Sequence, residues 1–234
     1  MNKRKSVDRR DLLRRLGFTG AALALPVVRS VRRGREEPAE EVAPAEDLMR
    51  EHGVLNRVLL VYEECLRRLS SKGADFAPRS FADAARIIRS FIEDYHEKVE
   101  EDHLFPRFEK ASRHVNLVKT LREQHRAGRR LTDEMLHLAT DAGFRNPADR
   151  ERLRADVTGF IRMYRPHEAR EDTVLFPAFR GIVSSHEYAS LGEDFEKKEH
   201  QLFGKEGFEG IVEKVAAIEK ELGIYDLAKF TPAR

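Results

Sequence analysis

The chain has no tryptophan, a single cysteine, 14 glycines and nine prolines in 234 residues. The one cysteine, Cys65, excludes an internal disulfide and a cluster of thiolate metal ligands. A lone thiol is more often a small buried apolar group than a nucleophile. The low glycine and proline content and the 36% of charged residues favour amphipathic helices over β structure. We therefore expect an all-α protein with one domain plus extensions.

Charge is unevenly distributed along the chain. Residues 1–35 contain eleven Lys and Arg against two Asp and Glu, whereas residues 36–234 contain 32 basic and 39 acidic residues. The main part of the chain is therefore mildly acidic and lacks the basic face that a nucleic acid requires. We expect no nucleic-acid partner.

The basic N-terminal segment is typical of an export leader. Residues 8–14 resemble the twin-arginine consensus, with paired arginines followed by apolar residues and another cation. The mostly apolar stretch 16–28 has the length of a signal-peptide core, and it is shorter than the ~20 residues that span a bilayer. We predict an export leader at 1–33, leading to a periplasmic or other extracytoplasmic location, and a flexible linker at 34–45. The alternative is a disordered basic tail on a cytoplasmic protein.

One motif occurs twice, 71 residues apart. In each copy a His and a Glu are four residues apart, and a Leu-Phe-Pro sequence follows. The copies are His96, Glu100 and residues 104–106, and His167, Glu171 and residues 175–177. Residues i and i+4 share one face of a helix, so each copy can present an imidazole and a carboxylate to one point. Two such helices that face each other can hold a pair of metal ions.

Apolar residues recur at helical spacing from residue 45 onwards. Four segments show this spacing: about 45–70, 80–103, 112–139 and 148–174. Each apolar seam carries a His where Leu or Ile would be expected. In the first and third segments these are His52 and His125, 73 residues apart. The sequence therefore predicts two similar helical hairpins.

Helical segments with short connections pack as bundles with their seams inward. We predict an up-down-up-down antiparallel four-helix bundle over 46–183, without a transmembrane span in the mature chain. Residues 184–234 form a C-terminal helical extension, in which 208–222 have the apolar spacing of a further helix. This helix is expected to cover one face of the bundle or to form a homodimer contact.

The inward positions of the four seams include six ionisable side chains. They are His52, His96, Glu100, His125, His167 and Glu171. Burial of an uncompensated carboxylate costs several kcal/mol, so such a core requires pairing or metal binding. Four neutral imidazoles and two carboxylates match a site for two divalent ions of iron, manganese or zinc, with the carboxylates as bridges. We predict these six residues as metal ligands.

The same residues resemble the hemerythrin family, in particular its bacterial HHE cation-binding branch, over about residues 46–179. The resemblance implies a non-haem di-iron centre that binds or senses O₂ or a related diatomic molecule or peroxide. It assigns the six inward residues as the ligands of two iron ions, with both carboxylates as bridges.

Two positions differ from the oxygen-carrying hemerythrins. Those carriers have a His-x-x-x-His on the third helix, whereas Leu121 and Arg129 stand at these offsets from His125. Their last ligand is an Asp five residues after its His, whereas Glu171 here follows His167 by four. These differences weaken reversible O₂ carriage and favour a sensor, a redox centre or an iron-holding protein.

Two further functions stay open beside O₂ binding or sensing. One is an oxidoreductase that acts on O₂, peroxide or nitric oxide, and the other is a passive iron-binding, storage or interaction module. A metal- or oxygen-binding protein is favoured over an enzyme.

A ferritin-like centre is the alternative architecture for the metal site, and it needs Glu-x-x-His on two helices. The local matches that begin at Glu93, Glu100 and Glu134 do not recur at the repeat offset, so we interpret them as chance.

Several residues near the motif have secondary predictions. His103 lies on the face of His96 and is the best spare ligand. Glu97 and Glu168 directly follow the motif histidines and point away from the apolar seam. We expect each of them to be either an exposed charge or a hydrogen-bond partner of a ligand. The Leu-Phe-Pro sequences are expected to pack and to end their helices. Tyr95 and Tyr164 are expected to pack in the core or to donate hydrogen bonds near the metals, and His114, His137 and His186 to lie on the surface.

Overall fold

The computed structural model describes residues 42–70, 78–204 and 206–232. Within these ranges the regular structure is helical and no strand occurs, which confirms the all-α prediction. The predicted export leader at 1–33, and all but the last four residues of the linker at 34–45, lie outside the described residues.

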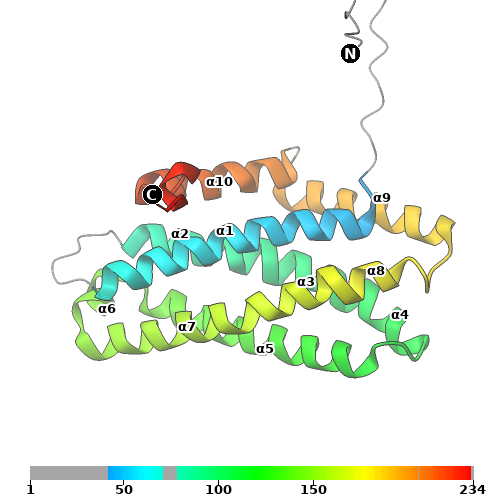
Figure 1. Cartoon of the computed structure of the whole chain (residues 1–234), viewed down its shortest axis with the longest axis horizontal. Coiled ribbons are helices and arrows are strands. Elements are labelled where there is room, and N and C mark those ends of the chain that lie inside the picture. The colour runs from blue at the N-terminus through cyan, green and yellow to red at the C-terminus, as the bar shows by residue number, and fades with distance from the viewer. Residues whose placement is uncertain (1–41, 71–77, 205, 233–234) are drawn as a thin grey trace, which may run out of the picture. The chain divides into compact units, whose positions relative to one another are not determined.

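Long helices form the bundle (Figure 1). The first is α1 (Pro44–Ser70). The second is nearly continuous and consists of α2 (Pro78–Ile87), η1 (Ile88–His96), α3 (Glu97–Val99), η2 (Glu100–Leu104) and α4 (Phe105–Lys110). The third is α5 (Val115–Leu138), and the short α6 (Asp141–Arg145) leads into the fourth, α7 (Pro147–Arg170), η3 (Glu171–Leu175) and α8 (Phe176–Phe179). α1 has acidic residues in its first turn and Arg67 and Arg68 in its last turn, which suits the helix dipole.

The Leu-Phe-Pro sequences do not end their helices, in contrast to the prediction. The helix continues through Pro106 in α4 and through Pro177 in α8. A π-helical turn, η2 or η3, precedes each proline, and each turn begins at a motif glutamate, Glu100 or Glu171. π-Helical turns inside α-helices are frequent at functional sites.

The turn η2 explains how the first proline is accommodated. The Phe105 N–H donates to the carbonyl oxygen of Glu100, five residues earlier. Pro106 has no N–H to donate in the same way. The carbonyl oxygen five residues before it, that of Glu101, instead accepts from Nη2 of Arg122 at 3.4 Å. The backbone acceptor that proline leaves free is thus satisfied by a side chain of α5.

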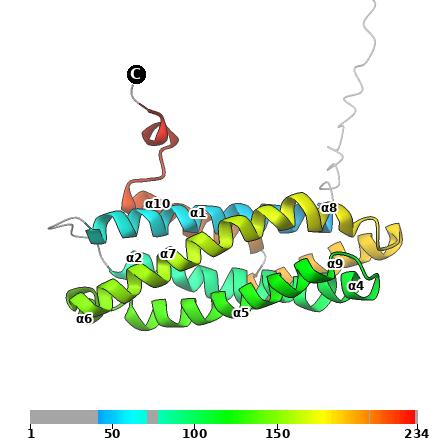
Figure 2. The ribbon, with the colours of Figure 1, turned by 60° about the horizontal axis from the view of Figure 1, so that its bottom comes forward.

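The long helices pack against one another around one apolar core (Figure 2). α7 packs against α1 and α5, and the α2–η1 segment packs against the same two helices. Tyr62, Phe81 and Phe160 are fully buried where these helices meet, with the ring centroids of Tyr62 5.2 Å from Phe81 and 5.6 Å from Phe160. None of the described helices is long and apolar enough to cross a membrane.

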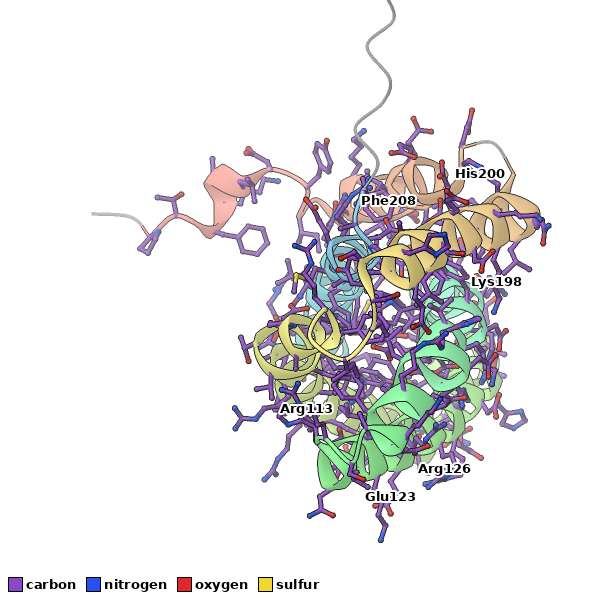
Figure 3. All side chains as sticks on the ribbon, turned by 90° about the vertical axis from the view of Figure 1, so that its right-hand side faces the viewer. Arg113, Glu123, Arg126, Lys198, His200 and Phe208 are labelled. Atoms are coloured by element: carbon purple, nitrogen blue, oxygen red, sulfur yellow. The ribbon has the colours of Figure 1, made fainter. Side chains whose placement is uncertain are left out.

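The C-terminal extension contains two helices and a short 3₁₀ turn. They are α9 (Ser185–Phe203), α10 (Gly207–Leu222) and η4 (Leu227–Phe230). Apolar spacing predicted the second helix only. α10 packs on α1 and α2, and α9 packs on α1 and α10, so the extension covers one side of the bundle. Figure 3 shows Lys198, His200 and Phe208 on this side and Arg113, Glu123 and Arg126 on the other.

An ion pair joins the extension to the bundle. Nε and Nη2 of Arg57 on α1 donate to the two carboxylate oxygens of Glu219 on α10, at 2.9 and 2.5 Å. Bidentate arginine–carboxylate pairs are the strong and directional kind. The side chain of Glu219 is 8% exposed, so this ion pair is mostly shielded from solvent and helps to orient α10 on the bundle.

Cys65 is buried in the core, as predicted for a small apolar group. Burial raises the pKa of its thiol to about 12. The thiolate is the reactive form of cysteine, so burial disfavours Cys65 as a nucleophile.

Gly128 on α5 allows a close approach of Tyr164 on α7. A Cβ atom at Gly128 would meet the hydroxyl oxygen of Tyr164, and the ring carbon beside it at 2.8 Å. We expect Gly128→Ala to lower the free energy of unfolding by about 1–3 kcal/mol, since overpacking strains a buried site. Urea unfolding followed by circular dichroism measures this change.

Gly159 on α7 is the matched control, because no atom lies within 4 Å of its added Cβ. Gly159→Ala is expected to stabilise the chain by about 0.5–1 kcal/mol through helix propensity alone. Equal effects of the two substitutions would contradict the close packing of Tyr164 on Gly128.

Candidate metal centre

The six predicted ligands come together inside the bundle, in two groups that share both glutamates. The groups are His52, His96, Glu100 and Glu171, and Glu100, His125, His167 and Glu171. In each group one ligand atom per residue lies within 4.8 Å of the others. All six side chains are buried, at 4% exposure or less. The hairpin of α1 and α2–α4 supplies one pair of histidines, and the hairpin of α5 and α7–α8 supplies the other.

The histidine nitrogens face each other in pairs. Nε2 of His52 is 3.1 Å from Nε2 of His96, and Nε2 of His125 is 3.3 Å from Nε2 of His167. Two nitrogens bound to one zinc ion at about 2.0–2.1 Å are about 2.9–3.4 Å apart when they subtend about 90–110° at the ion. Each pair of nitrogens is therefore spaced to share one cation.

The carboxylate oxygens of Glu100 and Glu171 lie between the histidine pairs. Oε2 of Glu171 is 3.3 Å from Nε2 of His52 and 3.1 Å from Nε2 of His167. Oε2 of Glu100 is 3.4 Å from Nε2 of His125. All four oxygens of the two glutamates are buried without a hydrogen-bond partner. Buried acceptors of this kind are rare because they lose their hydration, and here they fit a cation between them.

Burial and the neighbouring charges shift the pKa values of the ligands in opposite directions. Burial raises the pKa of Glu100 well above its usual value, and the negative charge of Glu171 raises it further. Burial acts on Glu171 in the same direction, but His167 and His52 outweigh it and hold the pKa well below its usual value. Burial also lowers the pKa of His125 to about 4, which keeps its ring in the neutral, metal-binding form.

Each of the four histidines has an acceptor for its second ring nitrogen. Nδ1 of His52 is 2.7 Å from Asp172, and Nδ1 of His96 is 2.5 Å from Glu51. The other two Nδ1 atoms have Glu101 and Gln124 as partners: His125 is 3.1 Å from Glu101, and His167 is 2.9 Å from Gln124. A neutral ring that donates Nδ1–H outwards presents the lone pair of Nε2 to the centre, and metal-bound histidines usually have such partners. Burial lowers the pKa of His52, but Asp172 and Glu171 outweigh it and raise the pKa to about 10, so a cation must displace a proton from this ring.

These partners follow a two-fold pattern. The residue before the His of a first helix, Glu51 or Gln124, supports the His of the second helix in the same hairpin. The residue after a motif Glu, Glu101 or Asp172, supports the first-helix His of the other hairpin. One position breaks the symmetry, because Glu51 is a carboxylate and Gln124 is a neutral amide.

Aromatic rings cover the first-helix histidines. Phe105 stacks on His125 and Phe176 stacks on His52, with ring centroids 5.4 Å apart in both pairs and interplanar angles of 25° and 23°. Both phenylalanines belong to the repeated Leu-Phe-Pro sequences, whose packing role is thereby confirmed. The stacked rings exclude water from one side of the site and fix the planes of the imidazoles.

Glu97 and Glu168 are not exposed, in contrast to one of the two expectations for them. Glu97 accepts a hydrogen bond from the hydroxyl of Tyr164 at 2.6 Å and pairs with Arg129 at 2.8 Å. Glu168 accepts from the side chain of Asn56 at 2.9 Å. Both serve as partners inside the bundle, because each finds a donor on a neighbouring helix.

The spare ligand candidate, His103, and the first glutamate of the ferritin-like matches, Glu93, lie outside the two groups. His103 is directed towards Phe195 on α9, with ring centroids 5.4 Å apart. Glu93 accepts from Thr132 at 2.5 Å and pairs with Arg89 at 2.8 Å. The hydroxyl of Tyr95 donates to a backbone oxygen of α9 at 3.4 Å. Three further histidines are exposed, as predicted: His114, His137 and His186.

Sequence reasoning missed the four residues that support the histidines. The signal was present, because Glu51 and Gln124 precede His52 and His125 at the same repeat offset of 73 residues. Glu101 and Asp172 follow the motif glutamates at the offset of 71. They were missed because they lie beside the apolar seam and not in it, and the seam pattern selects inward positions only. A side chain beside the seam can still turn towards a neighbouring helix.

Comparison with known proteins identifies the domain. The model of the hemerythrin HHE cation-binding domain matches residues 43–179. An uncharacterized protein of Mycobacterium bovis and two uncharacterized proteins from strains of Mycobacterium tuberculosis are each 48% identical to the chain over 205 residues. The matched region covers 86% of this chain and 80% of each relative. No solved structure matches the chain.

The support of His52 by Asp172 leads to a prediction on metal affinity. We expect Asp172→Ala to weaken divalent-metal binding by about 10–100-fold, because the ring of His52 loses the acceptor that orients it. Titration of the metal-free protein against a competing chelator measures the affinity. Asp102→Ala is the control, since Asp102 is exposed and forms an ion pair with Lys98 at 3.2 Å. Equal affinities of the two variants would contradict the role of Asp172.

Proposed function

Because the chain belongs to the family of hemerythrin HHE cation-binding domains, we propose that it holds two iron ions and binds or senses O₂ or a related small molecule. Glu100 and Glu171 are the bridging carboxylates. One ion takes the histidine pair His52 and His96, and the other takes His125 and His167. Manganese and zinc suit the same nitrogen and oxygen donors, so iron rests on the family resemblance.

One observation carries this proposal. Four imidazole Nε2 atoms and two carboxylates converge in a buried space, and no oxygen of the two carboxylates has a hydrogen-bond partner. Uncompensated burial of such groups costs several kcal/mol. Two divalent cations compensate both carboxylates and accept the lone pairs of all four rings.

The protein side chains prepare the site for a small ligand. Phe105 and Phe176 limit the entry of water, and the six donors are 4% exposed or less. A buried centre of this kind suits a diatomic molecule or peroxide better than a larger substrate. When bound, a di-iron pair supplies reversible electron exchange with such ligands.

The residues beside His125 support sensing or redox chemistry over carriage. Leu121 is buried and apolar, and Arg129 donates to Glu97 and Glu101, at 2.8 Å in both cases. Neither replaces the additional histidine of the oxygen carriers. Fewer protein donors leave coordination positions available to an external ligand.

We also infer the finer architecture and location. The contacts of α7 and the α2–η1 segment with both α1 and α5 support an up-down-up-down antiparallel four-helix bundle as the frame of the site. The basic segment 1–33 supports export by the twin-arginine route. Secretion of a reporter fused to this segment, lost on replacement of the paired arginines by lysines, tests that location.

Iron loading tests the proposed function. The protein, loaded anaerobically with Fe²⁺, is expected to hold two irons per chain and to change its absorption spectrum on exposure to O₂. A change that reverses on deoxygenation supports reversible binding, and an irreversible one supports redox chemistry. The absence of stoichiometric iron would overturn the di-iron proposal.

Substitution of a bridging carboxylate provides a second test. Glu100→Gln or Glu171→Gln is expected to lower the iron content to one ion per chain or fewer, because each carboxylate serves both ions. Glu93→Gln is the matched control, since Glu93 is equally buried but lies outside both groups. Retention of two irons by either bridging variant would argue against the bridges.

A further inference from the structure

A third cluster of carboxylates lies where the C-terminal extension meets the bundle. One carboxylate oxygen each of Asp47, Glu51 and Glu199 lies within 4.8 Å of the others. Asp47 and Glu51 are one turn apart on α1, and Glu199 lies near the end of α9. The cluster is separate from the six ligands described above, and it contains only oxygen donors.

Glu51 carries the argument that this cluster binds a ligand. Its side chain is 1% exposed, and Oε2 lies 2.5 Å from Nδ1 of His96. The other oxygen, Oε1, is buried without a hydrogen-bond partner. Glu199 is also buried, so the three neighbouring carboxylates repel one another with little screening by water at Glu51 and Glu199.

The surrounding groups relieve this repulsion only in part. Nη1 of Arg50, whose side chain is partly exposed, reaches Asp47 at 3.5 Å. Oε1 of Glu199 accepts the backbone N–H of Phe208 at 2.9 Å, at the start of α10. The hydroxyl of Tyr95 also faces the Glu51 carboxylate, but it donates to a backbone oxygen of α9, and Oε1 of Glu51 has no hydrogen-bond partner. A cation between the three carboxylates would supply the missing charge.

Gly207 allows Glu199 to take its position. Its φ of +37° lies in the left-handed region, and an added Cβ would meet Oε1 of Glu199. The chain thus turns closely over this carboxylate where α10 begins. Glu199 is buried there beside Asp47 and Glu51 of α1.

We propose that Asp47, Glu51 and Glu199 bind one hard divalent cation of the size of Ca²⁺. Ca²⁺ accepts six to eight oxygen ligands at about 2.3–2.6 Å, so oxygens as far apart as ~4.8 Å can share one ion. Asp47, with 18% of its side chain exposed, offers an entry from solvent. The ion joins α9 to α1, and one of its ligands, Glu51, is also the hydrogen-bond partner of His96.

Counting of bound Ca²⁺ tests the proposal on the full chain. Equilibrium dialysis with ⁴⁵Ca²⁺ is expected to give one ion per chain, with the iron content determined on the same sample. The double variant Asp47→Asn with Glu199→Gln is expected to bind Ca²⁺ at least about tenfold more weakly while its iron content is unchanged. Glu51 is left intact, because its substitution would also disturb His96.

The control variant carries the same change of charge on the same helices. Glu46→Gln with Glu193→Gln removes two exposed carboxylates from α1 and α9 and is expected to bind Ca²⁺ as the wild type does. Failure of the wild type to bind Ca²⁺, or equal binding by the two double variants, would overturn the proposal. Because iron and calcium are counted separately, loss of the iron pair does not decide the calcium result.

Amide hydrogen exchange gives a second measurement, which tests the proposal on the wild type even if the double variant folds poorly. Ca²⁺ is expected to slow amide exchange in α9 and α10 of the wild type and of the control variant. Asp47→Asn alone, at a partly exposed position, is expected to weaken this protection. Protection of α9 that does not depend on Ca²⁺ in the wild type would contradict a bridging cation.

Discussion

The structure depends on the burial of two carboxylates that no hydrogen bond satisfies. Glu100 and Glu171 lie inside the bundle, where four histidines from four helical segments converge on them. A core of this kind is costly unless positive charge is added to it. The stacked phenylalanines, the π-helical turns and the outward partners of the histidines all serve to aim six donors at that charge.

Much of the fold and the central donors followed from periodicity. A histidine is unusual in an apolar seam. The recurrence of His96 and Glu100 as His167 and Glu171 indicated that these seam residues have a common role. Helical spacing then places such residues on one inward face. The sequence therefore predicted the helices of the bundle and the convergence of the six side chains, which the structure brings into two adjoining groups.

The remainder depended on contacts between helices that spacing does not encode. Glu97 is off the seam, yet it is buried because Tyr164 and Arg129 on other helices donate to it. Pro106 was expected to end its helix, but a π-helical turn and Arg122 satisfy the backbone around it. The helix α9 was missed because it buries only a narrow apolar face, formed by Tyr188, Leu191 and Phe195.

The exchange of histidine partners between the hairpins has a consequence for the origin of the site. In the first hairpin, Glu51 supports His96, but His52 has its acceptor, Asp172, on the second hairpin. In the same way, His125 of the second hairpin has its acceptor, Glu101, on the first. One hairpin is therefore an incomplete unit that lacks a bridging carboxylate and an acceptor. Two identical hairpins about a two-fold axis would complete each other, and this chain has the arrangement of such a dimer fused into a single polypeptide.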